Sequence, residues 1–127
     1  SGFNHYSQGL PTWFRPLLQQ ICETCDVDFN ACLLNFYRNG KDHMGWHSDD
    51  ELTLDTTKPI ASLSIGSSRD FSLKHRFKRL KQKIKLNDGD LLIMHPTCQQ
   101  DWLHSIPVRS MVGGHRINLT FRRFLVY

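Results

Sequence analysis

The chain has 127 residues, 39% of them hydrophobic, and a formal net charge of +4. This length and composition favour one packed domain over residues 1–127 and exclude a disordered tail. No run approaches the ~18 consecutive apolar residues of a membrane span, and the opening SGFNHYSQG lacks the charged-then-apolar run of a signal peptide. We therefore expect a monomer with no membrane partner.

The first predicted element is an amphipathic helix over residues 11–25. Its apolar residues, such as Phe14, Leu18 and Ile21, recur at helical spacing. Pro16 is compatible with a helix only near the first turn. We expect this helix to cover one side of the domain.

After the helix the apolar period changes to two, which is the period of a β-strand. Turn residues interrupt the pattern at Asn39-Gly40 and Asn87-Asp88-Gly89. The segments predicted to be extended are 31–37, 59–66, 71–77, 80–86, 90–94, 102–108 and 116–127. One helix and roughly eight short strands favour a mainly β domain with a flanking helix, a sandwich or jelly roll, over a parallel sheet.

The cysteines indicate a reduced, intracellular protein. Cys22-Glu-Thr-Cys25 looks like half of a zinc site, but no second pair at similar spacing follows it. Cys32 and Cys98 stand alone. Four reduced thiols inside a cell are therefore the favoured interpretation.

Basic residues are concentrated between Lys74 and Lys85, where the chain reads KHRFKRLKQKIK without an acid. Alternation along a strand places Lys81, Lys83 and Lys85 on one face. Such a segment is either a solvated hairpin or a face that contacts phosphates, and the sequence leaves both open.

The last predicted strand carries polar residues on one face and apolar residues on the other. Period two aligns Arg116, Asn118, Thr120 and Arg122. This is either the wet side of a half-exposed strand or a receptor for a dicarboxylate, because the guanidinium fork matches carboxylate geometry.

The segment Gly45–Glu51 reads GWHSDDE and places His47 two residues before Asp49. In an extended segment these residues share a face and can bind one metal ion. His104, in a segment that precedes Pro107, is the best third ligand. Two imidazoles and one carboxylate form the facial triad of non-haem iron(II) oxygenases. A polar turn is the alternative.

Together these segments resemble the AlkB family of iron(II)- and 2-oxoglutarate-dependent nucleic-acid dealkylases, most closely its eukaryotic-type DNA-repair members. The resemblance runs from about residue 31 to residue 123, in family order. Its segments are Asn35–Asp42, His47–Glu51, Ile60–Gly66, Arg69–Phe71, His104–Pro107 and Arg116–Arg122.

The resemblance implies a double-stranded β-helix, or jelly roll, and assigns roles to individual residues. Iron would be bound by His47, Asp49 and His104. Arg122, pairing with the carboxylate far from iron, and Arg116 would hold 2-oxoglutarate. The remaining residues of that pocket would be Asn35, Tyr37, Asn118 and Thr120. On the substrate side, Tyr6 and Asp50 match family positions. The residues themselves offer Trp46, Arg69 and Phe71 as further substrate-side candidates, and they offer contacts for the nucleic-acid backbone at Lys74, Arg76, Lys81, Lys83 and Lys85.

The implied reaction is oxidative demethylation of N-alkylated bases in DNA or RNA, such as 1-methyladenine and 3-methylcytosine. Iron(II), 2-oxoglutarate and dioxygen would be required, and formaldehyde would be released. Family members carry more chain before the position of Tyr6, so residues 1–127 are expected to lack the N-terminal part of the nucleotide lid. A nuclear location is expected if the source is eukaryotic.

Two other functions remain open from the sequence. One is an iron(II)/2-oxoglutarate hydroxylase that acts on a protein or a small molecule. The other is a basic β module that binds nucleic acid without turnover, although this leaves the Arg-x-Asn-x-Thr-x-Arg pattern beside a distant histidine unexplained.

Overall fold

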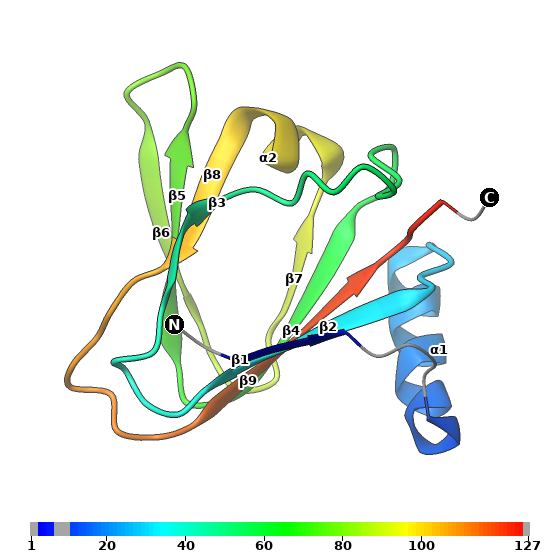
Figure 1. The fold of residues 1–127 in the computed structure, drawn as a ribbon, viewed down its shortest axis with the longest axis horizontal. Helices are drawn as coiled ribbons and strands as arrows, with labels where there is room; N and C mark the ends of the chain where they lie inside the picture. Colours follow the sequence, from blue (N-terminus) through cyan, green and yellow to red (C-terminus); the bar gives the residue numbers. More distant parts are fainter. Residues whose placement is uncertain (1–2, 7–10, 126–127) are drawn as a thin grey trace.

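Two antiparallel sheets face each other in the computed structural model (Figure 1), which describes residues 3–6, by their backbone, and residues 11–125. The first sheet has the strand order β1-β2-β9-β4-β7 and the second β3-β8-β5-β6. The first contains β1 (Phe3–Tyr6), β2 (Ala31–Tyr37), β9 (Arg116–Arg122), β4 (Ile60–Gly66) and β7 (Leu91–Met94). The second contains β3 (Met44–His47), β8 (Trp102–Ile106), β5 (Arg69–His75) and β6 (Lys81–Leu86).

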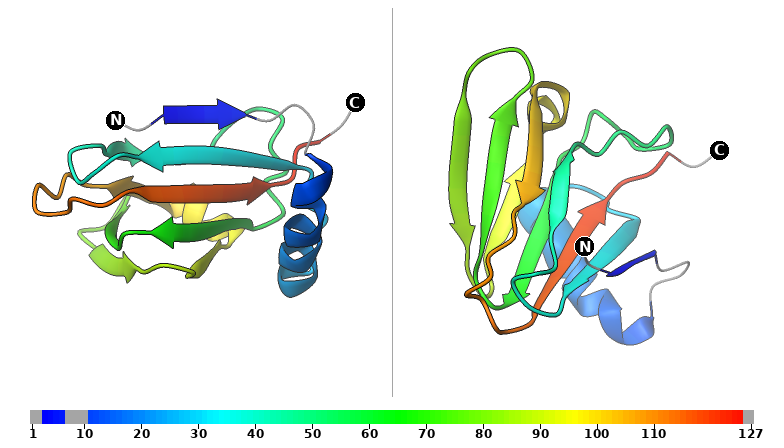
Figure 2. Two further views of the ribbon diagram at one scale, coloured as in Figure 1. Left: turned by 90° about the horizontal axis from the view of Figure 1, so that it is seen from below. Right: turned by 60° about the vertical axis from the view of Figure 1, so that its left-hand side comes forward.

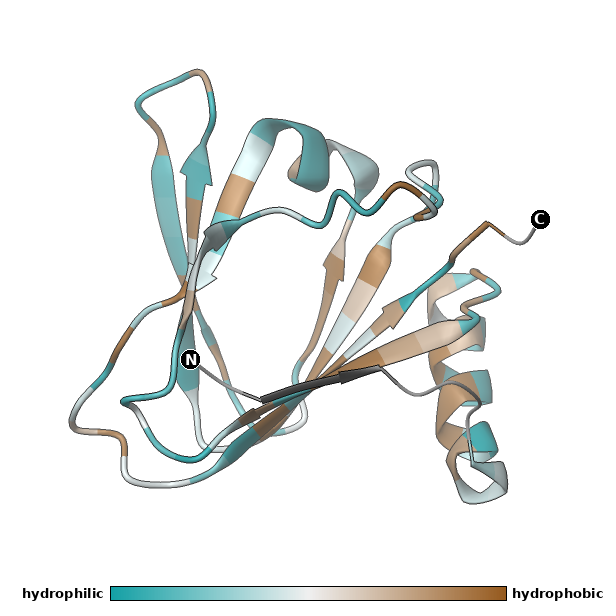
Figure 3. Cartoon of the chain, viewed as in Figure 1, coloured by the Kyte–Doolittle hydropathy of each residue, from teal (hydrophilic) through white to brown (hydrophobic). Residues whose placement is uncertain are grey.

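The predicted helix is present and lies outside the first sheet (Figure 2). A 3-10 turn, η1 (Thr12–Phe14), leads into α1 (Arg15–Cys25). Pro16 lies in the first turn of α1, where its missing N–H costs nothing. The helix ends at Asp26, whose backbone is left-handed with φ 54°. Its brown, apolar side faces the sheet in Figure 3.

One face of the first sheet is apolar, and the other carries both polar and apolar side chains. The apolar face packs under α1, where the rings of Phe14 and Phe121 stack with centroids 5.9 Å apart. This cluster comprises Phe14, Ile21, Val27, Phe29, Cys32, Ala61, Leu119 and Phe121. A second cluster lies between the sheets and comprises Tyr37, Leu54, Ile60, Phe71, Leu86, Met94 and Ile106. Because β9 sends Leu119 and Phe121 to the helix, alternation turns its polar residues inward.

The structure adds elements that the sequence did not predict. β1 pairs with β2 in antiparallel register, and β3 pairs with β8. A short helix, α2 (Pro96–Asp101), precedes β8. The last strand ends at Arg122 and not at residue 127; an isolated bridge between Leu54 and Phe124 follows it. These elements are four to six residues long and lack a clear apolar period, so only their partners define them.

The described residues contain no helix long and apolar enough to cross a membrane. The four cysteines are all free thiols, as the sequence predicts. In the part of the chain that the structure describes, Cys22 and Cys25 do not belong to a cluster of metal-binding side chains.

Candidate metal and 2-oxoglutarate site

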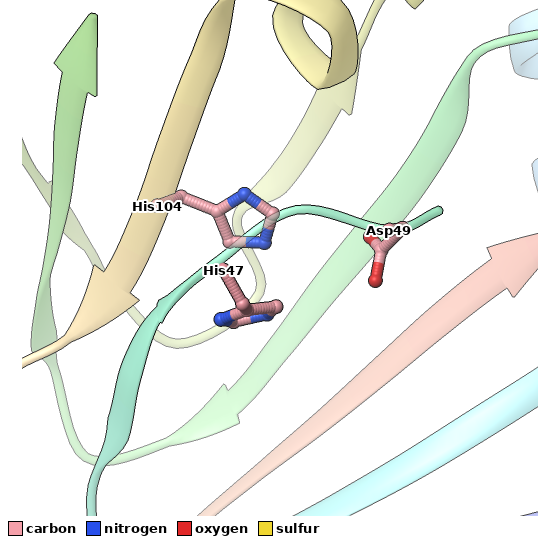
Figure 4. A group of neighbouring side chains, drawn as sticks. All are labelled: His47, Asp49 and His104. Carbon is pink, nitrogen blue, oxygen red and sulfur yellow. The ribbon is translucent and has the colours of Figure 1, made fainter. Parts of the chain in front are cut away.

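Three predicted metal ligands converge between the sheets. β3 and β8 are adjacent, and their register places His47 opposite His104. The two ring centroids are 4.2 Å apart. Asp49 follows β3, and one ligand atom from each of the three residues lies within 4.8 Å of the others (Figure 4). Residues 57 positions apart therefore meet because their strands pair.

The ring nitrogens of the two histidines differ in their partners. Nδ1 of His47 lies 2.7 Å from the carbonyl oxygen of Gly45, which can only accept, so Nδ1 is the donor and Nε2 is the nitrogen left for a metal. Burial, together with the nearby His47 and Arg122, lowers the pKa of His104 to about 3, which keeps the ring neutral. Nδ1 of His104 is buried without a hydrogen-bond partner among the described residues. A neutral, unsatisfied imidazole beside His47 and Asp49 fits a cation.

The carboxylate of Asp49 is fixed by an arginine. Nη2 of Arg122 donates to its Oδ1 at 3.0 Å, and the Arg122 side chain is only 4% exposed. Nη1 of Arg122 contacts both carboxylate oxygens of Glu51 at 3.1 Å. The backbone N–H of Asp49 donates to Oε1 of Gln99 in α2. Arg122 thus lies at the metal end of the pocket.

Arg116 lies at the other end of the same face of β9. It is 1% exposed, and its Nη2 donates to Oγ of Ser64 at 3.0 Å. Its Nε and Nη1 are buried and have no hydrogen-bond acceptor in the described part of the chain. Oδ1 of Asn35 is also buried and has no donor among the described residues. The guanidinium carbon lies 5.2 Å from the ring centroid of Tyr37. A buried guanidinium with two unsatisfied nitrogens fits a carboxylate ligand.

This arrangement corrects one assignment made from the sequence. Arg122 was expected to pair with the 2-oxoglutarate carboxylate far from iron. Arg122 contacts Asp49, one of the three predicted metal ligands, so the geometry favours Arg122 at the near end of a bound dicarboxylate. Arg116 lies at the other end, and we propose it as the partner of the far carboxylate.

One narrow pocket joins the two ends. Its lining includes every residue predicted for iron and 2-oxoglutarate, and in addition Ser62, Phe71 and several apolar side chains. The side chains leave about 40 Å³ of space, room for a few water molecules.

The predicted substrate-side residues do not gather in one place. Phe71 lines the pocket and packs against the His104 ring, with centroids 5.2 Å apart. Asp50 is exposed and lines the neighbouring hollow that shares Asp49. Tyr6 falls in β1, where the structure describes the backbone alone, so its side chain lies outside the described residues.

Two of the predicted substrate-side residues do not line the metal pocket. Arg69 is 2% exposed and donates to the backbone carbonyls of Asn39, Asp42 and Pro107, so it holds loops together and does not reach the pocket. Trp46 lies next to Lys74, whose Nζ is 4.6 Å from the indole centroid, and lines a hollow separate from the metal pocket.

The basic residues divide into two groups. Lys81, Lys83 and Lys85 are exposed along β6, and the register pairs Lys81 with Lys74. Arg76 follows β5, and its Nη2 contacts Oγ of Ser48 beside the metal pocket. The first group therefore faces outward from the second sheet, and Arg76 lines the neighbouring hollow that shares Asp49 with the metal pocket.

Sequence reasoning missed several residues that support the site. Ser62 donates to Oδ1 of Asn118 at 2.7 Å, and Ser64 accepts from Arg116. Both serines alternate with apolar residues in β4, a signal that could have placed them inward. Glu51 and Gln99 contact the site from a loop and from α2, and no periodic pattern marks them.

A family model described as the 2OG-Fe(II) oxygenase superfamily matches residues 4–122. The chain belongs to this superfamily. Its members are named for iron(II) and 2-oxoglutarate, which confirms the expected cofactors at the level of the family.

Curated relatives assign the chain to the AlkB family. It is 42% identical to human DNA oxidative demethylase ALKBH2 over 99% of this chain and 54% of the relative. It is 38% identical to the mouse protein of the same name, over 98% of this chain and 59% of the relative. It is 41% identical to bovine alpha-ketoglutarate-dependent dioxygenase alkB homolog 3, over 88% of this chain and 43% of the relative. The chain thus spans about half the length of these relatives.

A solved structure supports the fold. The structure of OsALKBH1 superposes with a TM-score of 0.64 at 20% identity, over 91% of this chain and 65% of that chain. This likeness confirms the predicted jelly roll of a 2-oxoglutarate oxygenase.

Proposed function

We propose that this protein removes N-linked methyl groups from bases of DNA or RNA by oxidation. The observation that carries the proposal is the single pocket in which His47, Asp49 and His104 adjoin the unsatisfied guanidinium of Arg116. The names of the relatives, DNA oxidative demethylase among them, supply the substrate class. The site residues predicted from the sequence are part of this proposal, with the corrections given above.

The protein contributes ligands, orientation and exclusion of water. His47, Asp49 and His104 would hold iron(II), while Arg116, Tyr37, Asn35 and the polar face of β9 would hold 2-oxoglutarate. When bound, these groups supply the oxidant that hydroxylates the methyl carbon, as 2-oxoglutarate loses carbon dioxide and becomes succinate. The hydroxymethyl product then separates into the free base and formaldehyde. Arg122 would keep Asp49 oriented toward the metal throughout.

The substrate base must leave its stack to reach the pocket. A methyl group on the pairing edge of a base weakens pairing, so extrusion costs less for a damaged base than for a normal one. Asp50, exposed next to Asp49, would face a cationic methylated base or its exocyclic amino group. Arg76, beside Ser48, would face the phosphates near the mouth.

We further propose that residues 1–127 form a single domain that works as a monomer. The proposed substrate places the protein inside cells, and in the nucleus if the source is eukaryotic.

The test is product analysis with iron(II), 2-oxoglutarate, dioxygen and ascorbate. Oligonucleotides containing 1-methyladenine or 3-methylcytosine, as DNA and as RNA, are compared with unmethylated strands and peptides. We expect formaldehyde and the unmodified base from methylated strands alone, with one succinate per base repaired. Succinate formation that only a peptide or small molecule stimulates would replace the proposal by another hydroxylase activity. Strand binding without any product would make the protein a binding module.

A further inference from the structure

Trp46 is an exposed aromatic side chain on the outside of the second sheet. Its exposed fraction is 43%, and neither apolar cluster of the described residues includes it. Its neighbour His47 lines the metal pocket, whereas Trp46 lines a separate hollow beside β5 and β6. A partly exposed indole does not gain the full free energy that burial of its apolar surface would provide. Core packing therefore does not account for this residue.

The indole borders a shallow hollow of about 340 Å³ that basic side chains share. The lining consists of Trp46, Ser72, Leu73, Lys81, Gln82 and Lys83. Lys74 places its Nζ 4.6 Å from the indole centroid. The register of β5 and β6 sets Lys74 opposite Lys81, so their side chains lie on the same face as the indole.

This face carries excess positive charge. Lys81, Lys83 and Lys85 are exposed along β6. Within β5 and β6 the sole acid is Asp70, and its Oδ2 accepts a hydrogen bond from Nε of Arg109 at 2.8 Å. The contact with Arg109, with Lys83 and Lys85 further away, holds the pKa of Asp70 below its usual value. Asp70 therefore has Arg109 as its partner, and the positive charges of Lys81 and Lys83 remain available to an external anion.

We propose that this hollow binds one nucleotide of a single-stranded nucleic acid, with the base stacked on Trp46 and the phosphate held by Lys81 and Lys83. Every base has a π-face, so such a subsite grips strands without reading sequence. Lysines contact phosphates as mobile point charges and add salt-dependent affinity. The inference rests on the proposed function, because it assigns the flanking nucleotide of the same substrate strand.

The position of β3 explains how one strand reaches both places. β3 is at the edge of the sheet order β3-β8-β5-β6. A strand that passes around this edge can place one base beside His47 on the inner face and a neighbouring base on Trp46 outside. The lysines of β6 have a rival explanation, since charged residues on an edge strand prevent pairing with other chains. That explanation concerns β6 and does not extend to Trp46 on β3.

Binding of an unmethylated strand tests the subsite without iron or turnover. The fluorescence anisotropy of a labelled single-stranded DNA of about eight thymidines reports its affinity for the full chain. We expect Trp46→Ala to weaken binding about tenfold and Trp46→Phe to restore most of it, because a phenyl ring still stacks. Trp13→Ala is the matched control, since Trp13 is 79% exposed on the α1 side. Equal affinity of Trp46→Ala and wild type would overturn the proposal.

The lysines are tested by salt dependence. Lys81→Gln with Lys83→Gln should lower the slope of log affinity against log salt by about one to two, and Lys41→Gln, also exposed, should not. Unchanged affinity together with new aggregation in light scattering would assign these lysines to protection of the β6 edge and overturn their part of the proposal.

Turnover separates this inference from the proposed function. Trp46→Ala should raise the KM for a methylated oligonucleotide about tenfold and leave the KM for a methylated mononucleotide unchanged, because only the longer substrate reaches the hollow. Trp46-dependent binding without any turnover would defeat the proposed function alone. Turnover of the oligonucleotide with an unchanged KM in Trp46→Ala would defeat the subsite alone.

Discussion

Arg122 donates a hydrogen bond from Nη2 to Oδ1 of Asp49 at 3.0 Å, and both side chains are less than a tenth exposed. The same arginine contacts Glu51 and lines the pocket proposed for 2-oxoglutarate. A residue next to a metal ligand orients that ligand and tunes the affinity for the metal. In the proposed site, one guanidinium would therefore link metal binding to cosubstrate binding.

Replacing Arg122 with alanine should destabilise the metal-free protein by about 3–5 kcal/mol, because it leaves the buried carboxylate of Asp49 without this partner. A divalent metal would then replace the lost cation. We therefore expect cobalt(II), a redox-stable substitute for iron(II), to raise the Tm of Arg122→Ala more than that of wild type.

The matched control is Arg123→Ala. Arg123 is the next residue, faces the other way and donates to Asp28. Its substitution should leave the metal-induced change in Tm as in wild type. An equal cobalt(II) response in wild type and Arg122→Ala would show that Arg122 does not support Asp49.

Arg116→Ala should raise the KM for 2-oxoglutarate about 100-fold, since a charge-assisted pair of hydrogen bonds contributes roughly 1.5–3 kcal/mol. Arg116→Lys should recover only part of this loss, because an ammonium lacks the guanidinium fork. The measurement is the rate of succinate release at increasing 2-oxoglutarate. A KM that stays at the wild-type value in Arg116→Ala would remove Arg116 from the cosubstrate site.

His47→Ala should abolish turnover and lower the iron content after purification, because it removes one of three converging ligands. His43→Ala is the control, since His43 is exposed in the loop before β3. Iron is determined by mass spectrometry and turnover by formaldehyde release. A His47→Ala protein that keeps wild-type turnover would refute the metal assignment.

Cys32 should resist alkylation in the native state. Burial raises the pKa of its thiol from 9.0 to about 12, against the opposing effects of Arg122 and Thr120. A raised thiol pKa means less thiolate, so at pH 8 the reactive fraction falls about a thousandfold. Labelling with iodoacetamide, followed by mass spectrometry, should modify Cys32 only after unfolding in urea. Labelling at equal rates with and without urea would contradict its burial.

The alternation of polar and apolar residues was sufficient to predict which side chains of a strand share a face. Alternation along 116–122 placed the polar residues of β9 on one face, and the structure turns that face toward the pocket. Period two is a local property of an extended chain, so it needs no partner to be recognised. The amphipathic helix was predictable for the same reason, because α1 buries Ile21 at helical spacing.

The residues that hold the site side chains in place could not be predicted from a periodic pattern. Glu51 reaches Arg122 from a loop, and Gln99 reaches Asp49 from the unpredicted helix α2. Neither follows a period, so each acquires its role only when distant segments pack. The outward position of Trp46 also depends on the register of β3 against β8.

The sequence by itself determined which side chains share a face and which chemistry they offer, because these follow from strand and helix geometry along a few residues. Tertiary structure alone decided that His47 lies opposite His104, that Arg116 and Arg122 face different ends of one pocket, and that Arg69 is buried among carbonyls. These relationships arise from pairing and packing between strands far apart in the chain, and no local pattern encodes them.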